Sequence, residues 1–92
     1  MYNLLQKKQI DLGLAAGIDT TLYAKPEFDN LQMYEIRIGL EHGIDASQYS
    51  KPEYEDAQMC EIRKGLELGL DVSNILNSDL SRYEMRDKLY NT

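Results

Sequence analysis

The 92-residue chain is poor in the residues that cross-links, metal sites and membrane segments require. It has a single cysteine, Cys60, so no disulfide can form within it. It has a single histidine, His42, and the residue spacings of zinc sites, EF-hand loops and phosphate-binding glycine loops are missing. No run approaches the ~18 apolar residues that a membrane span needs. A disulfide framework, a metal site and a transmembrane helix are therefore not expected.

Basic residues are also scarce, with 10 Lys and Arg against 16 Asp and Glu and a net charge of −6. Nucleic-acid backbones are bound chiefly by Lys and Arg, so direct nucleic-acid binding is not expected. The negative charge favours a basic partner surface. The first residues lack the long apolar core of a signal peptide, because Lys7, Lys8 and Asp11 interrupt them. The chain is predicted to be cytoplasmic and to bind no membrane.

What the sequence does contain is a tandem repeat, and its period of about 26 residues is typical of stacked repeat architectures. The central copy spans residues 31–56, the preceding copy spans 5–30, and a third begins at 57 and drifts after about 73. The recurring positions that define the unit are Ile36, Gly39, Leu40, Gly43, Asp45, Tyr49 and Pro52 in the central copy, and Ile62, Gly65, Leu66, Gly69 and Asp71 in the third.

Each unit is predicted to form a long helix, a tight corner and a helix of one turn. Gly17, Gly43 and Gly69 suit the left-handed residue that ends a helix, and an Asp two residues later suits the start of the short one. We therefore expect an all-α fold, a short right-handed helical-repeat array in a single domain 1–92. Its units lie at about 5–30, 31–56 and 57–77, with a polar capping helix at about 78–90.

The second and third long helices are predicted to begin near Pro26 and Pro52, because proline is tolerated in a first turn. Ser50 and Glu53 have the spacing of a capping box. Carboxylates near a helix start complement its positive end. We interpret the acidic residues here as such charges rather than as metal ligands or acid–base groups; they are Glu27, Asp29, Glu53, Glu55 and Asp56.

Gly39 and Gly65 lie inside the long helices, where each glycine costs about 1 kcal/mol relative to alanine. A cost that recurs in each unit indicates that another segment packs closely there. We expect that segment to be the short turn that carries Tyr23 or Tyr49.

The first helix is predicted to cap the array. Leu5, Ile10 and Leu14 form its apolar stripe, while Lys7 and Lys8 stand where the central copy has Met33 and Tyr34. A terminal repeat needs a more polar outer face, which this exchange provides.

Recurrent polar residues are open to two interpretations. Arg37 and Arg63 each precede a glutamate by four residues, and a glutamine recurs at Gln6, Gln32 and Gln58. These side chains either form hydrogen bonds between helices that set the stacking angle, or they form a polar face that docks a partner. Tyr34 has no tyrosine counterpart in the other copies and is a candidate contact residue together with Arg37 and Arg63.

The chain carries no recognisable catalytic constellation. A nucleophilic pair of Cys60 and His42 would need a third, orienting group, and none is evident. The sequence therefore predicts no catalytic, metal-binding or cofactor-binding residue, and the chain is not expected to be an enzyme.

The segment QMYEIRIGLEHGID, with KPEFDN before it, resembles a short helical repeat that occurs in tandem in bacterial mobile-element and phage proteins. The resemblance covers residues 10 to about 73, and it implies a structural or binding module in a cytoplasmic setting. The first copy departs from the pattern at Lys7, Lys8 and Asp11, which fits a cap. The residues that carry it are Gln32, Met33, Glu35, Ile36, Arg37, Gly39, Leu40, Glu41, Gly43 and Asp45, and again Gln58, Met59, Glu61, Ile62, Arg63 and Gly65.

These features predict a non-enzymatic module that binds a protein partner and is a monomer or a weak homo-oligomer. One alternative is a small acidic inhibitor of a nucleic-acid-binding defence protein, comparable to an anti-CRISPR protein. In it the acidic helix starts would imitate phosphates, and their residues are Glu27, Asp29, Glu53, Glu55 and Asp56. Another is a structural array that associates with itself.

Overall fold

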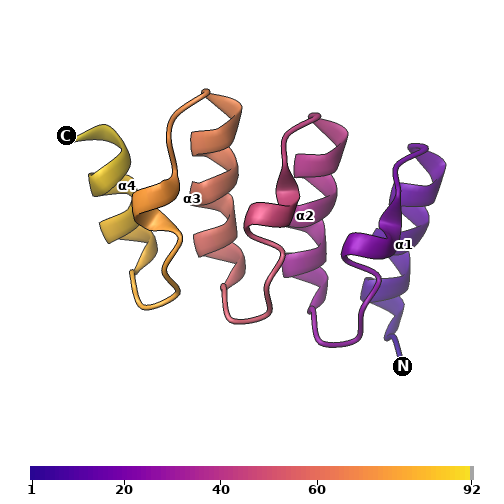
Figure 1. The fold of residues 1–92 in the computed structure, drawn as a ribbon. Coiled ribbons are helices and arrows are strands. Elements are labelled where there is room, and N and C mark those ends of the chain that lie inside the picture. The colour runs from indigo at the N-terminus through magenta and orange to yellow at the C-terminus, as the bar shows by residue number, and fades with distance from the viewer. Residues whose placement is uncertain (92) are drawn as a thin grey trace.

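In the computed structural model, which describes residues 1–91, the chain is all-α and holds seven helical elements without a strand (Figure 1). The predicted fold class is confirmed at this level. The four α-helices are α1 (Leu4–Ala15), α2 (Asn30–Glu41), α3 (Asp56–Glu67) and α4 (Arg82–Tyr90). Three 3-10 helices alternate with them, η1 (Thr20–Leu22), η2 (Ala46–Gln48) and η3 (Ser73–Ile75).

Each α-helix begins directly after a capping residue, and the four caps stand at equal intervals along the chain. In α2, the Asp29 carboxylate accepts the backbone N–H of Gln32 (2.8 Å), and the Gln32 side-chain oxygen accepts the N–H of Asp29 (2.9 Å). Such a reciprocal pair satisfies two N–H groups that a helix start leaves open. The four caps are Asn3, Asp29, Glu55 and Ser81.

Pro26 and Pro52 precede these caps and lie in turns, so the predicted helix starts are wrong. In the second turn the N–H of Tyr54 donates to the carbonyl of Lys51 (3.1 Å), which places Pro52 at the second position of a four-residue turn. Proline is favoured there because its ring fixes φ at the required value. The same proline preference serves both a turn and a helix start, and the turn prevails here.

The predicted capping box of Ser50 and Glu53 is also wrong. The Ser50 hydroxyl donates to the carbonyl of Ala46 (2.6 Å), four residues back, and Glu53 is an exposed turn residue. The last helix starts at Arg82, later than the predicted residue 78, after a turn in which Leu80 donates to the carbonyl of Asn77 (3.1 Å). That turn is equivalent to the two turns that contain Pro26 and Pro52. It could not be recognised in the sequence because it has no proline.

The glycines at the helix ends have the predicted conformation. After α2, the N–H of Gly43 donates to the carbonyl of Leu40 (3.1 Å) and the N–H of Ile44 donates to that of Gly39 (3.1 Å). These two bonds define a Schellman motif, which requires a positive φ. The φ values are 76° at Gly17, 76° at Gly43 and 73° at Gly69.

Asp19 and Asp45 cap η1 and η2 as predicted. At η3 the prediction is wrong, because the cap position is held by Val72 and Asp71 lies one residue before it. Each carboxylate accepts the backbone N–H two residues ahead, a bond that stabilises a tight turn. The bonds are Asp19 to Thr21 (3.0 Å), Asp45 to Ser47 (3.2 Å) and Asp71 to Ser73 (2.9 Å).

The short helices press a tyrosine onto the glycine inside the preceding α-helix. The Tyr49 hydroxyl donates to the carbonyl of Glu35 (2.7 Å), and a Cβ on Gly39 would lie 2.0 Å from that hydroxyl oxygen. Tyr23 packs on Gly13 in the same way. The expected close approach at Gly39 is confirmed.

At Gly65 the contact differs, because Ile75 stands at the position that Tyr49 holds in the preceding unit. A Cβ there would lie 2.9 Å from Cγ1 of Val72 and 3.2 Å from Cδ1 of Leu89. The close approach predicted at this glycine therefore exists, but aliphatic side chains make it.

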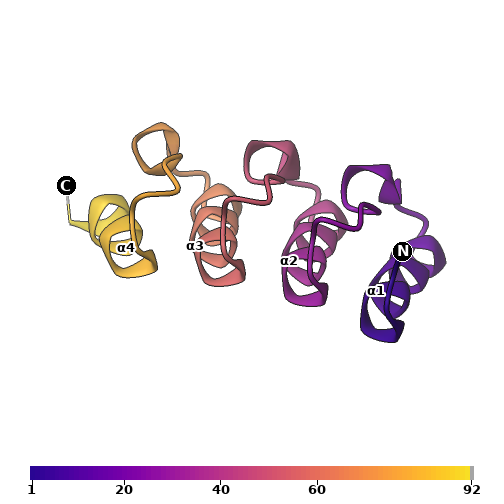
Figure 2. The same cartoon turned by 90° about the horizontal axis from the view of Figure 1, so that it is seen from below.

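The core lies between a layer of α-helices and a layer of short helices (Figure 2). Met33, Ile36, Met59 and Ile62 are fully buried, and Leu40 and Leu66 pack partly buried against them. Burying each such side chain contributes roughly 1.5–3 kcal/mol. Only the face of each α-helix that meets the short helices and its neighbours is used in this way.

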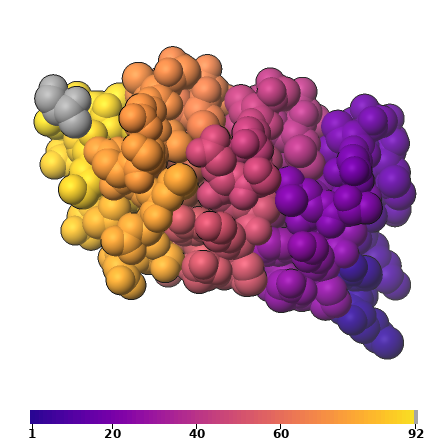
Figure 3. Space-filling model, in the orientation of Figure 1, coloured from indigo at the N-terminus to yellow at the C-terminus, as the bar shows by residue number. Residues whose placement is uncertain are grey.

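The α-helices pack in chain order, each on the next, and the two ends of the chain lie at opposite ends of the molecule (Figure 1). The principal extents are 40 × 23 × 14 Å, and the surface is a continuous slab (Figure 3). Within residues 1–91 no helix is both long and apolar enough to cross a lipid bilayer.

Candidate functional site

The recurrent glutamines connect each α-helix to the turn that precedes the next one. The Gln32 side-chain amide donates to the carbonyl oxygens of Tyr54 (2.6 Å) and Pro52 (3.1 Å). Because its oxygen also caps α2, the whole amide group is used inside the molecule. Gln6 and Gln58 make the corresponding bonds, to Phe28 (2.6 Å) and to Leu80 (2.6 Å).

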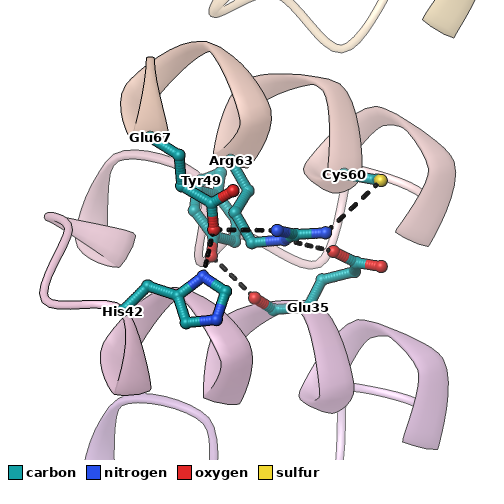
Figure 4. A network of polar contacts seen from close by, with 6 residues as sticks. All are labelled: Glu35, His42, Tyr49, Cys60, Arg63 and Glu67. Carbon is teal, nitrogen blue, oxygen red and sulfur yellow. Dashed lines mark hydrogen bonds and ion pairs between the residues drawn. The ribbon is translucent and has the colours of Figure 1, made fainter. Parts of the chain in front are cut away.

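Arg63 bridges α2 and α3 (Figure 4). Its Nε donates to Glu35 Oε1 (2.8 Å) on α2, and its Nη1 donates to Glu67 Oε2 (2.8 Å) on its own helix. Burial acts to lower the pKa of the Arg63 guanidinium, but the bonds to Glu35 and Glu67 outweigh it and raise that pKa. The charged group is thus held between helices, with 13% of the side chain exposed.

Arg37 occupies the corresponding place between α1 and α2. Its Nε donates to Gln9 Oε1 (2.9 Å), its Nη1 pairs with Glu41, and its guanidinium lies 5.4 Å from the centroid of the Tyr34 ring. Arg37 is buried. Both arginines therefore join helices, which leaves Tyr34 as the exposed member of the three predicted contact residues.

His42 and Cys60 both touch the Arg63 network but do not approach each other as a catalytic pair (Figure 4). His42 Nδ1 pairs with the Glu67 carboxylate, and Cys60 Sγ accepts a weak bond from Arg63 Nη2 (3.7 Å). Burial, followed by the nearby Glu35 charge, raises the pKa of the Cys60 thiol. A raised pKa disfavours the reactive thiolate.

The acidic residues before α3 have separate local surroundings. Glu53 is exposed in the turn, Glu55 is the cap whose backbone N–H donates to Gln58 Oε1 (2.7 Å), and Asp56 is the first helical residue. Within the described part of the chain, no three His, Cys, Asp or Glu side chains gather as metal ligands would.

Apolar side chains remain uncovered on one side of α1 and α2, which we name the open face. In α1 two leucines seven residues apart share that side, and in α2 a leucine, a tyrosine and an isoleucine follow the i, i+3, i+7 pattern. Leu5 and Leu31 occupy equivalent positions on adjacent helices, as do Leu12 and Ile38. The exposed fractions are 58% for Leu5, 39% for Leu12, 52% for Leu31 and 40% for Tyr34, and Ile38 is half-buried.

The sequence predicted Leu5 and Leu14 in the apolar stripe of the first helix, but both are exposed, and only Ile10 of that stripe is half-buried. The equivalent of Leu5 in α2 is Leu31, which begins an apolar stripe with Tyr34 and Ile38. Periodicity alone does not distinguish a buried stripe from an exposed one, so the exposure of Leu5 could not be predicted. On α3 the corresponding positions are Ala57, Cys60 and Lys64, so the apolar row ends there.

Comparisons of the chain with models of known protein families, with curated proteins and with solved structures find no match.

Proposed function

We propose that the chain is a protein-binding module, built as a right-handed array of repeated helical units, and that the open face of α1 and α2 is its docking surface. The observation that carries the proposal is the row Leu5, Leu12, Leu31 and Tyr34, exposed on adjacent helices. Exposed apolar side chains that gather on one face are typical of interaction sites. Lys8 stands between Leu5 and Leu12 on this face, at the position that Tyr34 holds in α2. The recurrent Gln and Arg side chains are already bonded between helices, so they supply the scaffold.

The occupant that fits best is an amphipathic helix of a partner protein with Lys or Arg beside its apolar stripe. Such a helix lays apolar residues at i, i+3, i+4 and i+7 onto a complementary surface. The chain carries a net charge of −6, and exposed carboxylates of Glu27, Asp29 and Glu55 lie at the starts of α2 and α3, at one end of the open face. Basic flanks on the partner would pair with them. The repeat resemblance favours a cytoplasmic phage or mobile-element setting.

Selection from a display library of random helical peptides tests this proposal. The purified chain should enrich peptides that combine an apolar stripe with Lys or Arg. Leu31→Ser and Tyr34→Ala should each weaken the binding of the selected peptide more than tenfold, because central apolar anchors dominate such interfaces. The matched control is Leu68→Ser, because Leu68 is 64% exposed at the end of α3, outside the open face.

Two results would contradict the proposal. One is enrichment of peptides whose affinity is unchanged by Leu31→Ser and Tyr34→Ala. The other is the absence of any enriched helical peptide under conditions in which the chain is folded by circular dichroism.

A second candidate function, inhibition of a nucleic-acid-binding defence protein by phosphate mimicry, is favoured by the spacing of exposed carboxylates. Glu27, Glu53 and Asp79 occupy equivalent turn positions in successive units along one edge. In a panel of defence nucleases, the chain should protect nucleic acid from at least one enzyme, and Glu53→Lys should abolish the protection. Unchanged protection by that variant would remove this candidate.

A further inference from the structure

The three contacts between successive α-helices use the same kinds of side chain, and we call each of them a junction. The earlier helix contributes a glutamine amide that donates to carbonyls of the next turn, together with a side-chain acceptor. The later helix contributes a buried methionine and an arginine that donates to that acceptor. The donor–acceptor pairs are Arg37 Nε to Gln9 (2.9 Å), Arg63 Nε to Glu35 (2.8 Å) and Arg86 Nη2 to Glu61 (2.9 Å), and the methionines are Met33, Met59 and Met85, each 0% exposed. Arg37 and Arg63 hold equivalent positions, whereas Arg86 stands three residues earlier in its unit, and 53% of its side chain is exposed.

The side of α4 that faces away from α3 lacks the glutamine. Glu84 stands at the position that Gln58 holds in the preceding unit, and its carboxylate accepts the backbone N–H of Ser81 (2.9 Å). A carboxylate cannot donate to carbonyl oxygens. Asp87, exposed and hydrogen-bonded by Asn91 (2.5 Å), stands at the acceptor position of Glu61.

The side of α1 that faces away from α2 lacks the other two groups. Lys7 stands at the position that Met33 holds in the next unit, Asp11 stands at the position of Arg37, and both are exposed. If α1 were packed on another helix by this side, the Lys7 ammonium group would enter the position of a buried methionine. The Asp11 carboxylate would face a hydrogen-bond acceptor. Burying an unpaired charge is strongly unfavourable.

We infer that Lys7, Asp11, Glu84 and Asp87 keep these two outer sides from forming a fourth junction with a second copy of the chain. If α1 of one copy stacked on α4 of another in the manner of the first two junctions, Asp11 would meet Asp87 where Arg63 meets Glu35. Like charges at that separation repel each other. Glu84 would face carbonyl oxygens, acceptor against acceptor. End-to-end assembly is blocked, and the open face stays available.

The inference goes beyond the proposed function, and exchanging junction residues tests it. The variant Lys7→Met/Asp11→Arg/Glu84→Gln restores the methionine, the arginine and the glutamine of an internal junction. Its mass in sedimentation or light scattering should rise with concentration from the monomer mass of 10.6 kDa to successive multiples. Adding Asp87→Arg to this variant should return it to the monomer, because Arg would then meet Arg. Circular dichroism of each variant establishes that it is folded.

A second variant reverses the pair and guards against a folding defect in the first. Lys7→Met/Glu84→Gln/Asp87→Arg keeps Asp11 and places the arginine on α4, so it should also assemble. The inference is overturned if a folded variant of either type remains monomeric, if assembly survives the Arg–Arg combination, or if the unsubstituted chain already forms end-to-end multimers.

Discussion

Gly39 has no side chain because Tyr49 occupies the space where a Cβ would lie. The tyrosine hydroxyl is 2.0 Å from that Cβ position and donates to the carbonyl of Glu35 (2.7 Å). The bond ties η2 to α2 and thereby fixes the corner between them. The loss of about 1 kcal/mol of helix propensity at the glycine is offset by the burial of a whole tyrosine side chain, which is 0% exposed.

Gly39→Ala should therefore destabilise the protein, although alanine is the better helix former. A clash with a buried ring costs about 1–3 kcal/mol, which exceeds the propensity gain. Urea unfolding measures the change in the free energy of unfolding. In the double variant Gly39→Ala/Tyr49→Phe the nearest atom is gone and the closest ring carbon lies at 3.2 Å, so its loss should be smaller than the sum of the two single losses. Additive losses would contradict the contact.

Glu67 contributes stability that depends on pH. Burial acts to raise its pKa, but the hydrogen bonds from His42 and Arg63 and their charges outweigh it and lower the pKa below 4.5. A carboxylate with a lowered folded-state pKa stabilises the fold above its unfolded pKa, and this contribution is lost as the pH falls through the folded pKa. Glu67→Gln should cost on the order of 0.5 kcal/mol at neutral pH.

That cost should shrink toward zero when urea unfolding is repeated below pH 4.5. A difference between Glu67→Gln and the unsubstituted protein that stays constant across this range would show that the carboxylate charge has no part in the junction. Glu53→Gln, in an exposed turn, is the matched control and should change little at either pH.

At the scale of the element, local signals predicted the helix ends better than the helix starts. A glycine such as Gly43 has one structural use at the end of an amphipathic stretch, so its role followed from the sequence. Pro52 has two uses, in a turn or in a first helical turn, and only the packing of Tyr54 into the core decides between them. Asp29 was identified as acidic but not as the cap, because several carboxylates share that stretch.

Gln32 joins two elements, since it caps α2 and holds the turn before α3. Gln32→Ala should destabilise the protein by about 1–3 kcal/mol, because the buried carbonyl of Tyr54 loses the side-chain donor at 2.6 Å. Chemical unfolding of Gln32→Ala beside Gln48→Ala measures the difference. Gln48 lies in η2, half-buried and away from the junctions, and its replacement should change stability by less than about 0.5 kcal/mol. Equal losses would indicate a general effect of removing glutamine.

At the scale of the whole molecule, the sequence could not show which polar residues are free. The spacing of four residues correctly paired Arg37 with Glu41 and Arg63 with Glu67. The second partner of Arg63 is Glu35, which is 28 residues away, and that pairing depends on how one helix stacks on the next. The exposure of Leu5 could not be predicted for the same reason, because its burial depends on how neighbouring helices pack and not on the helix itself.

Because each α-helix packs on its chain neighbours, damage at one junction should stay local. Such stacks behave as a sum of unit stabilities and nearest-neighbour terms. Met85 is fully buried between α3 and α4, and Met85→Ala should cost about 2–5 kcal/mol. Hydrogen exchange followed by mass spectrometry should show faster exchange across α4 and η3, while amides of α1 and α2 keep most of their protection.

Met59→Ala, at the central junction, should instead speed exchange on both sides of it. If Met85→Ala accelerated exchange equally in all four α-helices, the molecule would be one cooperative unit, and the nearest-neighbour description would be wrong.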